Sequence, residues 1–217
     1  MIEEARKSIA REEFDYQALL DALKGYKRPR DAITRLLRSG AIVRVKKGLY
    51  VFGEAWARRP FSREVLANLI YGPSYVSLES ALHYYGLIPE RVEAVTSATF
   101  VRGKRFPTLV GLFIYTRVPQ NAYPVAVDRV ELTIDTACLM ATPEKALADK
   151  VGSERGSGLR FLGQMEEYLL NNLRVDEEDL AALSPDRMDA IAQAYGSLRV
   201  DLLAGVVRRH GRRRAVA

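Results

Sequence analysis

The residues best suited to chemistry in this sequence are polar and basic side chains between Lys27 and Phe52. Thr34, Arg35 and Arg38 lie at spacings that place them on one side of a helix, because an α-helix turns about 100° per residue. An arginine can donate two hydrogen bonds to a guanine edge, and a threonine can donate, accept or contact a thymine methyl. The pattern predicts that these three side chains contact base edges in a DNA groove.

Other basic residues of this segment are placed to bind phosphate rather than to distinguish bases. Arg28 and Arg30 precede or begin the same helix, where free backbone N–H groups also favour an anion. Lys46 and Lys47 are expected at the exposed tip of a β-hairpin, with Arg44 beside them, and such contacts position a protein on DNA without specifying sequence. The complete predicted DNA-binding set is Arg28, Arg30, Thr34, Arg35, Arg38, Arg44, Lys46 and Lys47.

Two helices and a hairpin are expected to hold these side chains. Apolar residues at helical spacing, beginning with Phe14, predict a first helix that ends before Gly25. A second helix is expected over 29–39, with a proline at its first position. Two β-rich runs at 42–45 and 49–52 flank a short glycine-containing turn. This order is typical of a winged helix-turn-helix, although an amphipathic helix with a solvated charged face would also explain the second helix.

Positive charge is concentrated in this part of the sequence. The chain has 33 lysines and arginines against 27 aspartates and glutamates, which gives a net charge of +6. Ten basic residues and two acidic ones, Asp31 and Glu54, lie between Lys27 and Arg59, so this window holds more than the surplus of the whole chain. A concentrated positive field attracts polyanions and weakens with salt. Nucleic acid is therefore the expected partner.

The remaining composition fits a cytoplasmic protein, and the length alone allows one large domain or two modest ones. The 217 residues include a single cysteine, Cys138, which we interpret as a small buried hydrophobe in an apolar strand. The N-terminal segment contains charges throughout and does not resemble a signal peptide. No apolar run reaches membrane-spanning length, so no membrane partner is expected.

The residues after the hairpin predict an α+β unit. Helices are expected at 62–71, 77–85 and from Thr142, and strands between Glu93 and Met140 in a mainly antiparallel sheet. Further helices are expected at about 159–172, 177–183, 185–195 and 198–209. The predicted domains are a winged helix-turn-helix at 1–57 and a second domain at 58–217, divided into an α+β core at 58–150 and a helical part at 151–217.

Sequence patterns typical of enzymes are weak. His83 and His210 are not spaced for a metal site, and we interpret His83 as a packing residue. The glycine-rich loop at 152–158 lacks the lysine and hydroxyl residue of a P-loop, which favours a connector over a phosphate cradle. We therefore expect no catalytic residue, no metal ligand and no cofactor. The basic run at 208–214 could hold flanking phosphate, but a disordered solvated tail is the favoured interpretation.

Four stretches of the sequence resemble the AbiEi family, the antitoxins of bacterial type IV toxin–antitoxin (abortive infection) systems. The residues concerned are Val45–Val51 (VKKGLYV), Tyr75–Glu90 (YVSLESALHYYGLIPE), Val95–Thr99 (VTSAT) and Ala141–Asp149 (ATPEKALAD). Together they extend over about the first 150 residues, and the helical remainder adds no motif to the resemblance.

The resemblance implies a winged helix-turn-helix that represses its own operon by binding inverted repeats in double-stranded promoter DNA. It also implies a second domain that counters a nucleotidyltransferase-like toxin without forming a stable complex with it. Three alternatives stay open: a winged-helix transcription factor that senses a small ligand and has no toxin partner, an enzyme acting on nucleic acid or nucleotides that the first domain targets to DNA, and an antitoxin that covers its toxin directly.

Overall fold

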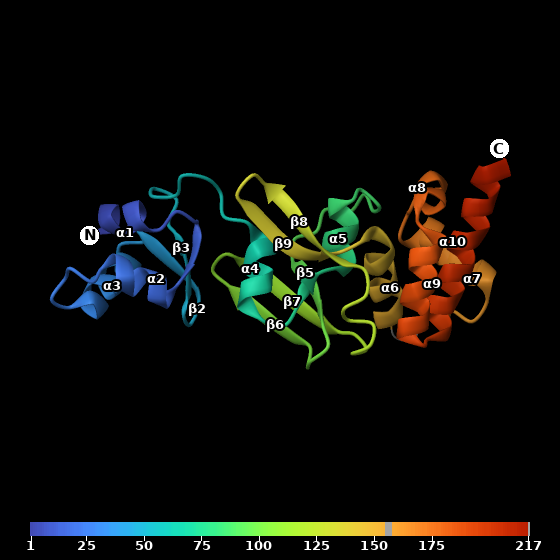
Figure 1. Ribbon diagram of the computed structural model, residues 1–217, viewed down its shortest axis with the longest axis horizontal. Helices are drawn as coiled ribbons and strands as arrows, with labels where there is room; N and C mark the ends of the chain where they lie inside the picture. Colours follow the sequence, from blue (N-terminus) through green and yellow to red (C-terminus); the bar gives the residue numbers. More distant parts are fainter. Residues whose placement is uncertain (155–157, 217) are drawn as a thin grey trace.

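The computed structural model describes residues 1–154 and 158–216, without the side chains of 213–216. Part of the predicted connector at 152–158 therefore lies outside the described residues. Figure 1 shows three parts in a row: an N-terminal unit, a central sheet with its helices, and a C-terminal group of helices. This arrangement is a mixed α+β fold, as the sequence predicted.

The N-terminal unit combines helices with a three-stranded antiparallel sheet of order β1-β3-β2. Its elements are α1 (Ile2–Ser8), β1 (Glu13–Asp15), α2 (Tyr16–Ala22), α3 (Pro29–Arg38), β2 (Ile42–Lys46) and β3 (Leu49–Phe52). The prediction that Phe14 lies in the first helix is wrong, because it belongs to β1. The Asp15 side chain accepts a hydrogen bond from the Ala18 amide at 2.8 Å and so caps α2 after the strand. Phe14 packs against Phe52 with ring centroids 4.6 Å apart.

The hydrophobic core of the N-terminal unit includes a buried ion pair. Arg6 and Glu12 are both almost completely buried and pair with each other, and the Arg6 guanidinium lies 4.2 Å from the ring centroid of Phe52. The pair fixes the segment between α1 and β1 because separating two buried charges is expensive. The hairpin also contributes to a second core, since Val45, Leu49 and other residues belong to the hydrophobic cluster of the central part.

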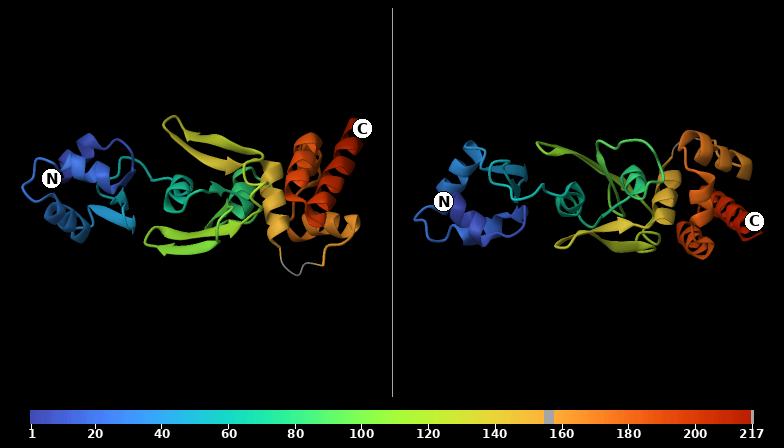
Figure 2. Two further views of the ribbon diagram at one scale, coloured as in Figure 1. Left: turned by 60° about the horizontal axis from the view of Figure 1, so that its bottom comes forward. Right: turned by 90° about the horizontal axis from the view of Figure 1, so that it is seen from above.

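The central part is built on a six-stranded sheet of order β6-β7-β5-β4-β9-β8 within the described residues. Its elements are α4 (Arg63–Ile70), β4 (Tyr75–Val76), α5 (Leu78–Tyr84), β5 (Val95–Thr99), β6 (Lys104–Thr108), β7 (Gly111–Arg117), β8 (Val127–Thr133), β9 (Thr136–Ala141) and α6 (Pro143–Ser153). The β5–β7 and β4–β9 pairs are parallel and the other three are antiparallel, so the sheet is mixed. The β6–β7 and β8–β9 hairpins extend on either side toward the N-terminal unit (Figure 2).

The C-terminal part is helical. It contains α7 (Leu162–Glu167), a π-helical turn η1 (Tyr168–Asn172), α8 (Glu177–Ala182), α9 (Pro185–Tyr195) and α10 (Leu198–Val216), and α10 packs against α7, α8 and α9. The prediction of a disordered tail at 208–214 is wrong for the described backbone, which is helical throughout. His210 explains why this segment is helical instead of disordered. It is 2% exposed and its Nε2 lies 2.8 Å from Glu166 Oε1, and this contact anchors the last turns of α10.

A search of the described residues for a helix that is both long and apolar enough to cross a bilayer finds none.

A buried polar network joins the central sheet to the helices around it. Lys145 and Asp149, on successive turns of α6, are both fully buried, and Lys145 Nζ lies 2.9 Å from Asp149 Oδ1. The hydroxyls of Tyr75 (2.9 Å), Ser77 (2.6 Å) and Tyr195 donate to the Asp149 carboxylate. The Lys145 ammonium also lies 4.6 Å from the ring centroid of Tyr195. These contacts link α6 to β4, to the start of α5 and to α9.

The beginning of α6 is fixed in a similar way. Thr142 caps the helix and Pro143 occupies its first turn, as the sequence predicted. Glu144 accepts a hydrogen bond from the Ser184 amide at 2.9 Å and pairs with Arg187 at 3.1 Å, which joins α6 to the start of α9. These contacts with positive and polar partners lower the pKa of the Glu144 carboxyl in spite of its burial.

We expect the substitution Asp149→Ala to lower the free energy of unfolding by ~3–5 kcal/mol, because it leaves the Lys145 ammonium buried without a countercharge. The double variant Lys145→Met with Asp149→Leu should lose less free energy of unfolding than the single variants Lys145→Met and Asp149→Leu lose together. It removes both charges and approximately keeps the side-chain volume. Urea denaturation of the unchanged protein, Asp149→Ala, the single variants Lys145→Met and Asp149→Leu, and the double variant measures these free energies. Additive losses would show that the two side chains do not interact energetically.

Candidate nucleic-acid interface

The helix α3 separates its apolar and polar residues onto opposite sides. Ala32, Ile33 and Leu36 are buried in the N-terminal core, and Leu37 is half-buried. The predicted base-contacting residues are all exposed on the other side, together with the predicted phosphate-binding residues of the helix start: Arg28, Arg30, Thr34, Arg35 and Arg38. Packing against α2 and β2 supports this short helix, which would be unstable in isolation.

The exposed arginines of α3 are weakly held and can rotate toward a ligand. Arg28 lies 3.8 Å from Asp31, but 84% of the Arg28 side chain and 59% of the Asp31 side chain are exposed, so the pair contributes little. The Arg35 Nε lies 3.5 Å from the Asp31 carbonyl, which is a long hydrogen bond. The Thr34 hydroxyl donates to the Arg30 carbonyl at 3.0 Å and keeps its lone pairs and methyl group available.

The hairpin after α3 presents two of the three predicted basic residues to solvent. Gly48 has a φ of +87°, a conformation that a residue with a side chain seldom adopts, and it closes the turn between β2 and β3. The ladder shifts register between Arg44 and Lys46, which marks an irregularity in β2. Arg44 and Lys47 are exposed.

Lys46 differs from the prediction that it lies at the exposed tip of the hairpin. The side chain is half-buried, and Nζ donates a hydrogen bond to the Ile70 carbonyl at the end of α4. Burial lowers the pKa of Lys46, because the charged ammonium loses water. The register shift next to Lys46 explains why its side chain turns toward the central part. An irregular strand can direct a side chain away from the face that regular alternation along the strand would give it. Lys46 therefore joins the hairpin to the central part instead of extending into solvent.

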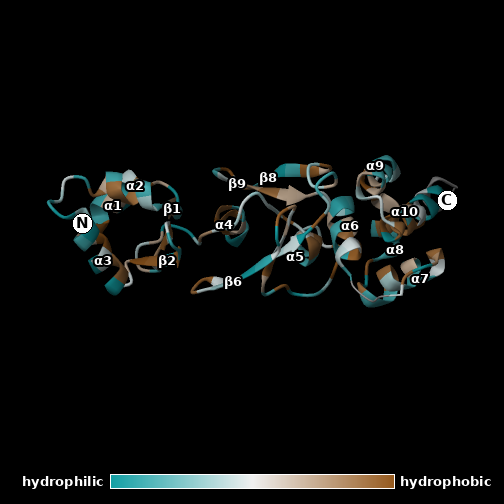
Figure 3. Ribbon diagram, turned by 90° about the horizontal axis from the view of Figure 1, so that it is seen from below, coloured by the Kyte–Doolittle hydropathy of each residue, from teal (hydrophilic) through white to brown (hydrophobic). Residues whose placement is uncertain are grey.

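A groove separates the hairpin from the central part. It has a volume of about 1080 Å³ and lies between β2, an edge strand of its sheet, and residues 107–109 at the end of β6 and the start of the turn after it. Three of its lining residues, Arg44, Lys46 and Lys47, are basic, and none is acidic. Figure 3 shows that β6 is hydrophilic and that its hairpin points toward the N-terminal unit.

A second basic segment, in the central part, was not predicted from the sequence. The stretch from Ala94 to Val127 contains no acidic residue, and its four basic residues are all exposed: Arg102, Lys104, Arg105 and Arg117. They lie on or beside β6 and β7, and β6 leads directly to the groove at the hairpin. The missing carboxylates were a signal in the sequence, but only the fold shows that this segment approaches the basic hairpin.

The residues that suggested enzymatic chemistry remain separate. Within the part of the chain that the structure describes, no three histidine, cysteine, aspartate or glutamate side chains are grouped to hold a metal ion. His83 is exposed on α5, so the interpretation of it as a packing residue is wrong. Cys138 is buried and unpaired in β9, which agrees with its interpretation as a small core residue.

Comparison of the chain with models of protein families finds no match, and a search of curated proteins finds no similar sequence.

We expect Cys138 to resist alkylation by iodoacetamide at pH 8 in the folded protein and to react rapidly in urea. Burial raises the pKa of its thiol to about 12, and only the thiolate is a good nucleophile. Mass spectrometry of samples quenched over an hour measures the modified fraction. Rapid labelling of the folded protein would mean that β9 opens readily, because Cys138 is only 4% exposed in the structure.

Proposed function

We propose that residues 1–57 form a winged helix-turn-helix that binds double-stranded promoter DNA. The observation that supports this most strongly is the exposed basic side of α3 next to the exposed Arg44 and Lys47 of the hairpin. In such domains the second helix of the pair enters the major groove and flanking cations hold the phosphates. Thr34, Arg35 and Arg38 would contact bases in this arrangement.

The phosphate contacts are assigned to the basic residues around α3. Arg28, Arg30, Arg44 and Lys47 are exposed and therefore available to DNA. Lys46 is assigned a smaller role in phosphate binding than the sequence suggested, because the Ile70 carbonyl accepts a hydrogen bond from its ammonium group. The exposed cations of β6, Lys104 and Arg105, could extend the contact along the DNA axis beyond the hairpin.

We also propose that the protein represses its own operon and acts as the antitoxin of a type IV toxin–antitoxin system. The resemblance of four stretches to the AbiEi family supports this, and these stretches include the hairpin Val45–Val51 and the α6 segment Ala141–Asp149. The functional partner would be a nucleotidyltransferase-like toxin that the protein counters without a stable complex. A ligand-sensing transcription factor is the second candidate, and a hollow of about 680 Å³ in the central part favours it.

We expect Arg35→Ala to weaken binding to the operator by about 1–3 kcal/mol and to reduce the preference for operator over random DNA, since it removes a base contact. Fluorescence anisotropy with both DNA sequences measures the two affinities. Arg160→Ala is a matched control, because Arg160 is an exposed arginine that lies in the C-terminal part. An equal loss on both DNA sequences would contradict a base-reading role.

We expect Lys47→Ala to weaken operator and random DNA by the same factor and to reduce the slope of log K against log salt by about 0.9, the value for one lost phosphate contact. Titrations between 50 and 300 mM KCl would determine the slope. Lys46→Ala should change the slope less, because its ammonium is held by the Ile70 carbonyl. Equal slopes for Lys47→Ala and the unchanged protein would exclude the hairpin from the interface.

The antitoxin role predicts an adjacent gene for a nucleotidyltransferase-like protein whose expression arrests growth. Co-expression of this chain should restore growth, and size-exclusion chromatography of the two proteins should show no joint peak. A variant with Arg35→Ala should lose repression and retain protection if the second domain counters the toxin. Growth arrest that this chain does not relieve would contradict the proposal.

A further inference from the structure

A hollow lined by three arginines lies at the open end of the β6–β7 hairpin, opposite the turn that borders the groove at β2. It has a volume of about 790 Å³, which is within the range of small-molecule sites. Four segments form its walls: the residues between β5 and β6, the end of β7, the end of α6 and the start of α10. We call it the arginine hollow, and its cations come from three of these segments: Arg102, Arg117 and Arg199.

Two of the arginines are brought together by the pairing of β6 with β7. The ladder joins Lys104 to Tyr115, so two further residues in the same register would place Arg102 opposite Arg117. Gly103 lies against β7, because a Cβ built on it would be 2.8 Å from the Tyr115 carbonyl oxygen and 3.6 Å from the Arg117 nitrogen. Like charges at facing positions destabilise a sheet, so this pair costs stability unless an anion binds beside it.

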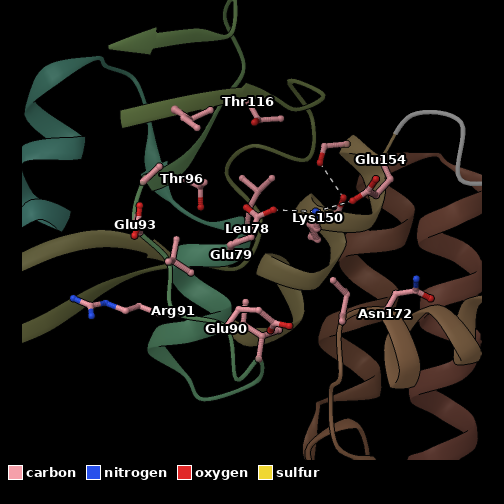
Figure 4. Close-up of a pocket in the computed structure, with 16 residues that line it drawn as sticks. Leu78, Glu79, Glu90, Arg91, Glu93, Thr96, Thr116, Lys150, Glu154 and Asn172 are labelled. Carbon is pink, nitrogen blue, oxygen red and sulfur yellow. Dashed lines mark hydrogen bonds and ion pairs between the residues drawn. The ribbon is translucent and has the colours of Figure 1, made fainter. Parts of the chain in front are cut away.

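The carboxylates near the arginine hollow do not neutralise this pair. Glu154 is the one acidic residue among its described lining residues, and Glu154 Oε1 lies 2.6 Å from Lys150 Nζ. Lys150 Nζ also lies 2.9 Å from Glu79 Oε1, in the adjoining hollow that Figure 4 shows. Counting Lys150 with Glu79, and Arg199 with Glu154, cancels both carboxylates. The two facing arginines remain, and the segment 94–127 that contains them has no acidic residue.

The third arginine is oriented by the backbone of α6. An Nη1–H of Arg199 donates to the Glu154 carbonyl, and the side chain is half-buried. A guanidinium has five N–H donors, and this bond uses one of them. The others are available to phosphate oxygens, which arginine binds through two parallel hydrogen bonds. The Thr116 hydroxyl also lies in the wall and can donate to a phosphate oxygen.

We propose that the arginine hollow binds the diphosphate or triphosphate group of a small molecule. Three arginines that converge from separate segments match several negative charges on adjacent phosphoryl groups, and a concave site admits the end of a phosphate chain. A DNA duplex is convex and presents singly charged phosphates along a line, which suits the exposed side of α3 better. Phe100 also lines the hollow, so the group attached to the phosphates can be a nucleoside whose base stacks on an aromatic ring.

The proposal goes beyond DNA binding and antitoxin activity and rests on neither of them. The hollow and the groove at β2 share no lining residue, so failure of one site and failure of the other can be observed separately.

Isothermal titration of the full chain with sodium tripolyphosphate, without Mg²⁺, tests the site. Titration at about 150 mM KCl screens weak attraction between exposed charges. We expect saturation at one tripolyphosphate per chain. A parallel titration with adenosine triphosphate distinguishes two sources of the phosphate group. Tighter binding of the nucleotide than of tripolyphosphate would assign a nucleotide site, and equal affinity would assign a site for the phosphate chain alone.

We expect Arg117→Gln to weaken tripolyphosphate binding at least about tenfold, because it removes a charge-assisted contact. Arg102→Gln should have a similar effect from the facing position. Arg105→Gln is the matched control, since Arg105 is an exposed arginine of the same hairpin outside the hollow, and screening should keep its effect within about twofold.

Melting temperatures separate ligand binding from a structural role. Arg117→Gln should melt at or above the temperature of the unchanged protein, because it relieves repulsion between facing arginines. Tripolyphosphate should raise the melting temperature of the unchanged protein and leave that of Arg117→Gln nearly constant, since only a ligand that binds the folded state stabilises it.

Three results would overturn the proposal. The first is the absence of saturable tripolyphosphate binding. The second is a loss of affinity that is equal for Arg105→Gln and Arg117→Gln, or that accompanies a lower melting temperature in both Arg102→Gln and Arg117→Gln. The third is displacement of tripolyphosphate by an equimolar random-sequence DNA duplex, which would make this surface part of a nucleic-acid interface.

Discussion

The contact on which most of the fold depends is the buried pair of Lys145 and Asp149 in α6. Two charges without exposure to water are tolerated only when they neutralise each other and satisfy their remaining hydrogen-bonding groups. The Asp149 carboxylate meets that condition through three hydroxyl donors, from Tyr75, Ser77 and Tyr195, whereas the Lys145 ammonium lies against the aromatic rings of Tyr75 and Tyr195. Burial and the nearby Asp149 charge raise the pKa of Tyr75 and Tyr195, which keeps both phenols protonated as donors. One helix thereby fixes the central sheet against the C-terminal helices.

The N-terminal unit is attached to this framework by a few polar contacts. The Lys46 ammonium donates to the Ile70 carbonyl, and the Ser62 amide donates to the buried Glu13 carboxylate. These contacts, with the hairpin residues that enter the central hydrophobic cluster, set the position of the basic face relative to β6. The exposed Arg44 and Lys47 of the hairpin thus line a groove whose other side is formed by the end of β6 and the turn after it.

The stretches that resemble the AbiEi family are joined in the structure. Tyr75 and Ser77 of the second stretch bond Asp149 of the fourth, and the Thr96 hydroxyl of the third donates to the Ser77 carbonyl at 2.7 Å. These residues support the central part and lie apart from the proposed DNA contacts. The resemblance outside the hairpin thus concerns the framework of the second domain, and the proposed antitoxin role depends on surfaces that this framework supports.

Local patterns in the sequence determined much of the architecture. The amphipathic spacing of α3, the glycine turn of the hairpin, and Thr142 with Pro143 at the start of α6 act over a few residues, and each was predictable because capping, turn formation and periodicity are local effects. The mixed α+β class followed from the order of these elements.

The tertiary structure decided the features that depend on distant neighbours. Nothing near Lys46 in the sequence indicates the Ile70 carbonyl that holds it, and nothing near His210 indicates the glutamate on α7 that keeps the last helix packed. The strand β6 contains a proline and charges that local propensities disfavour, and it forms because β7 pairs with it. The hollow between α5, β7 and α6 is assembled from segments between Leu78 and Leu173, so only the folded chain brings its walls together.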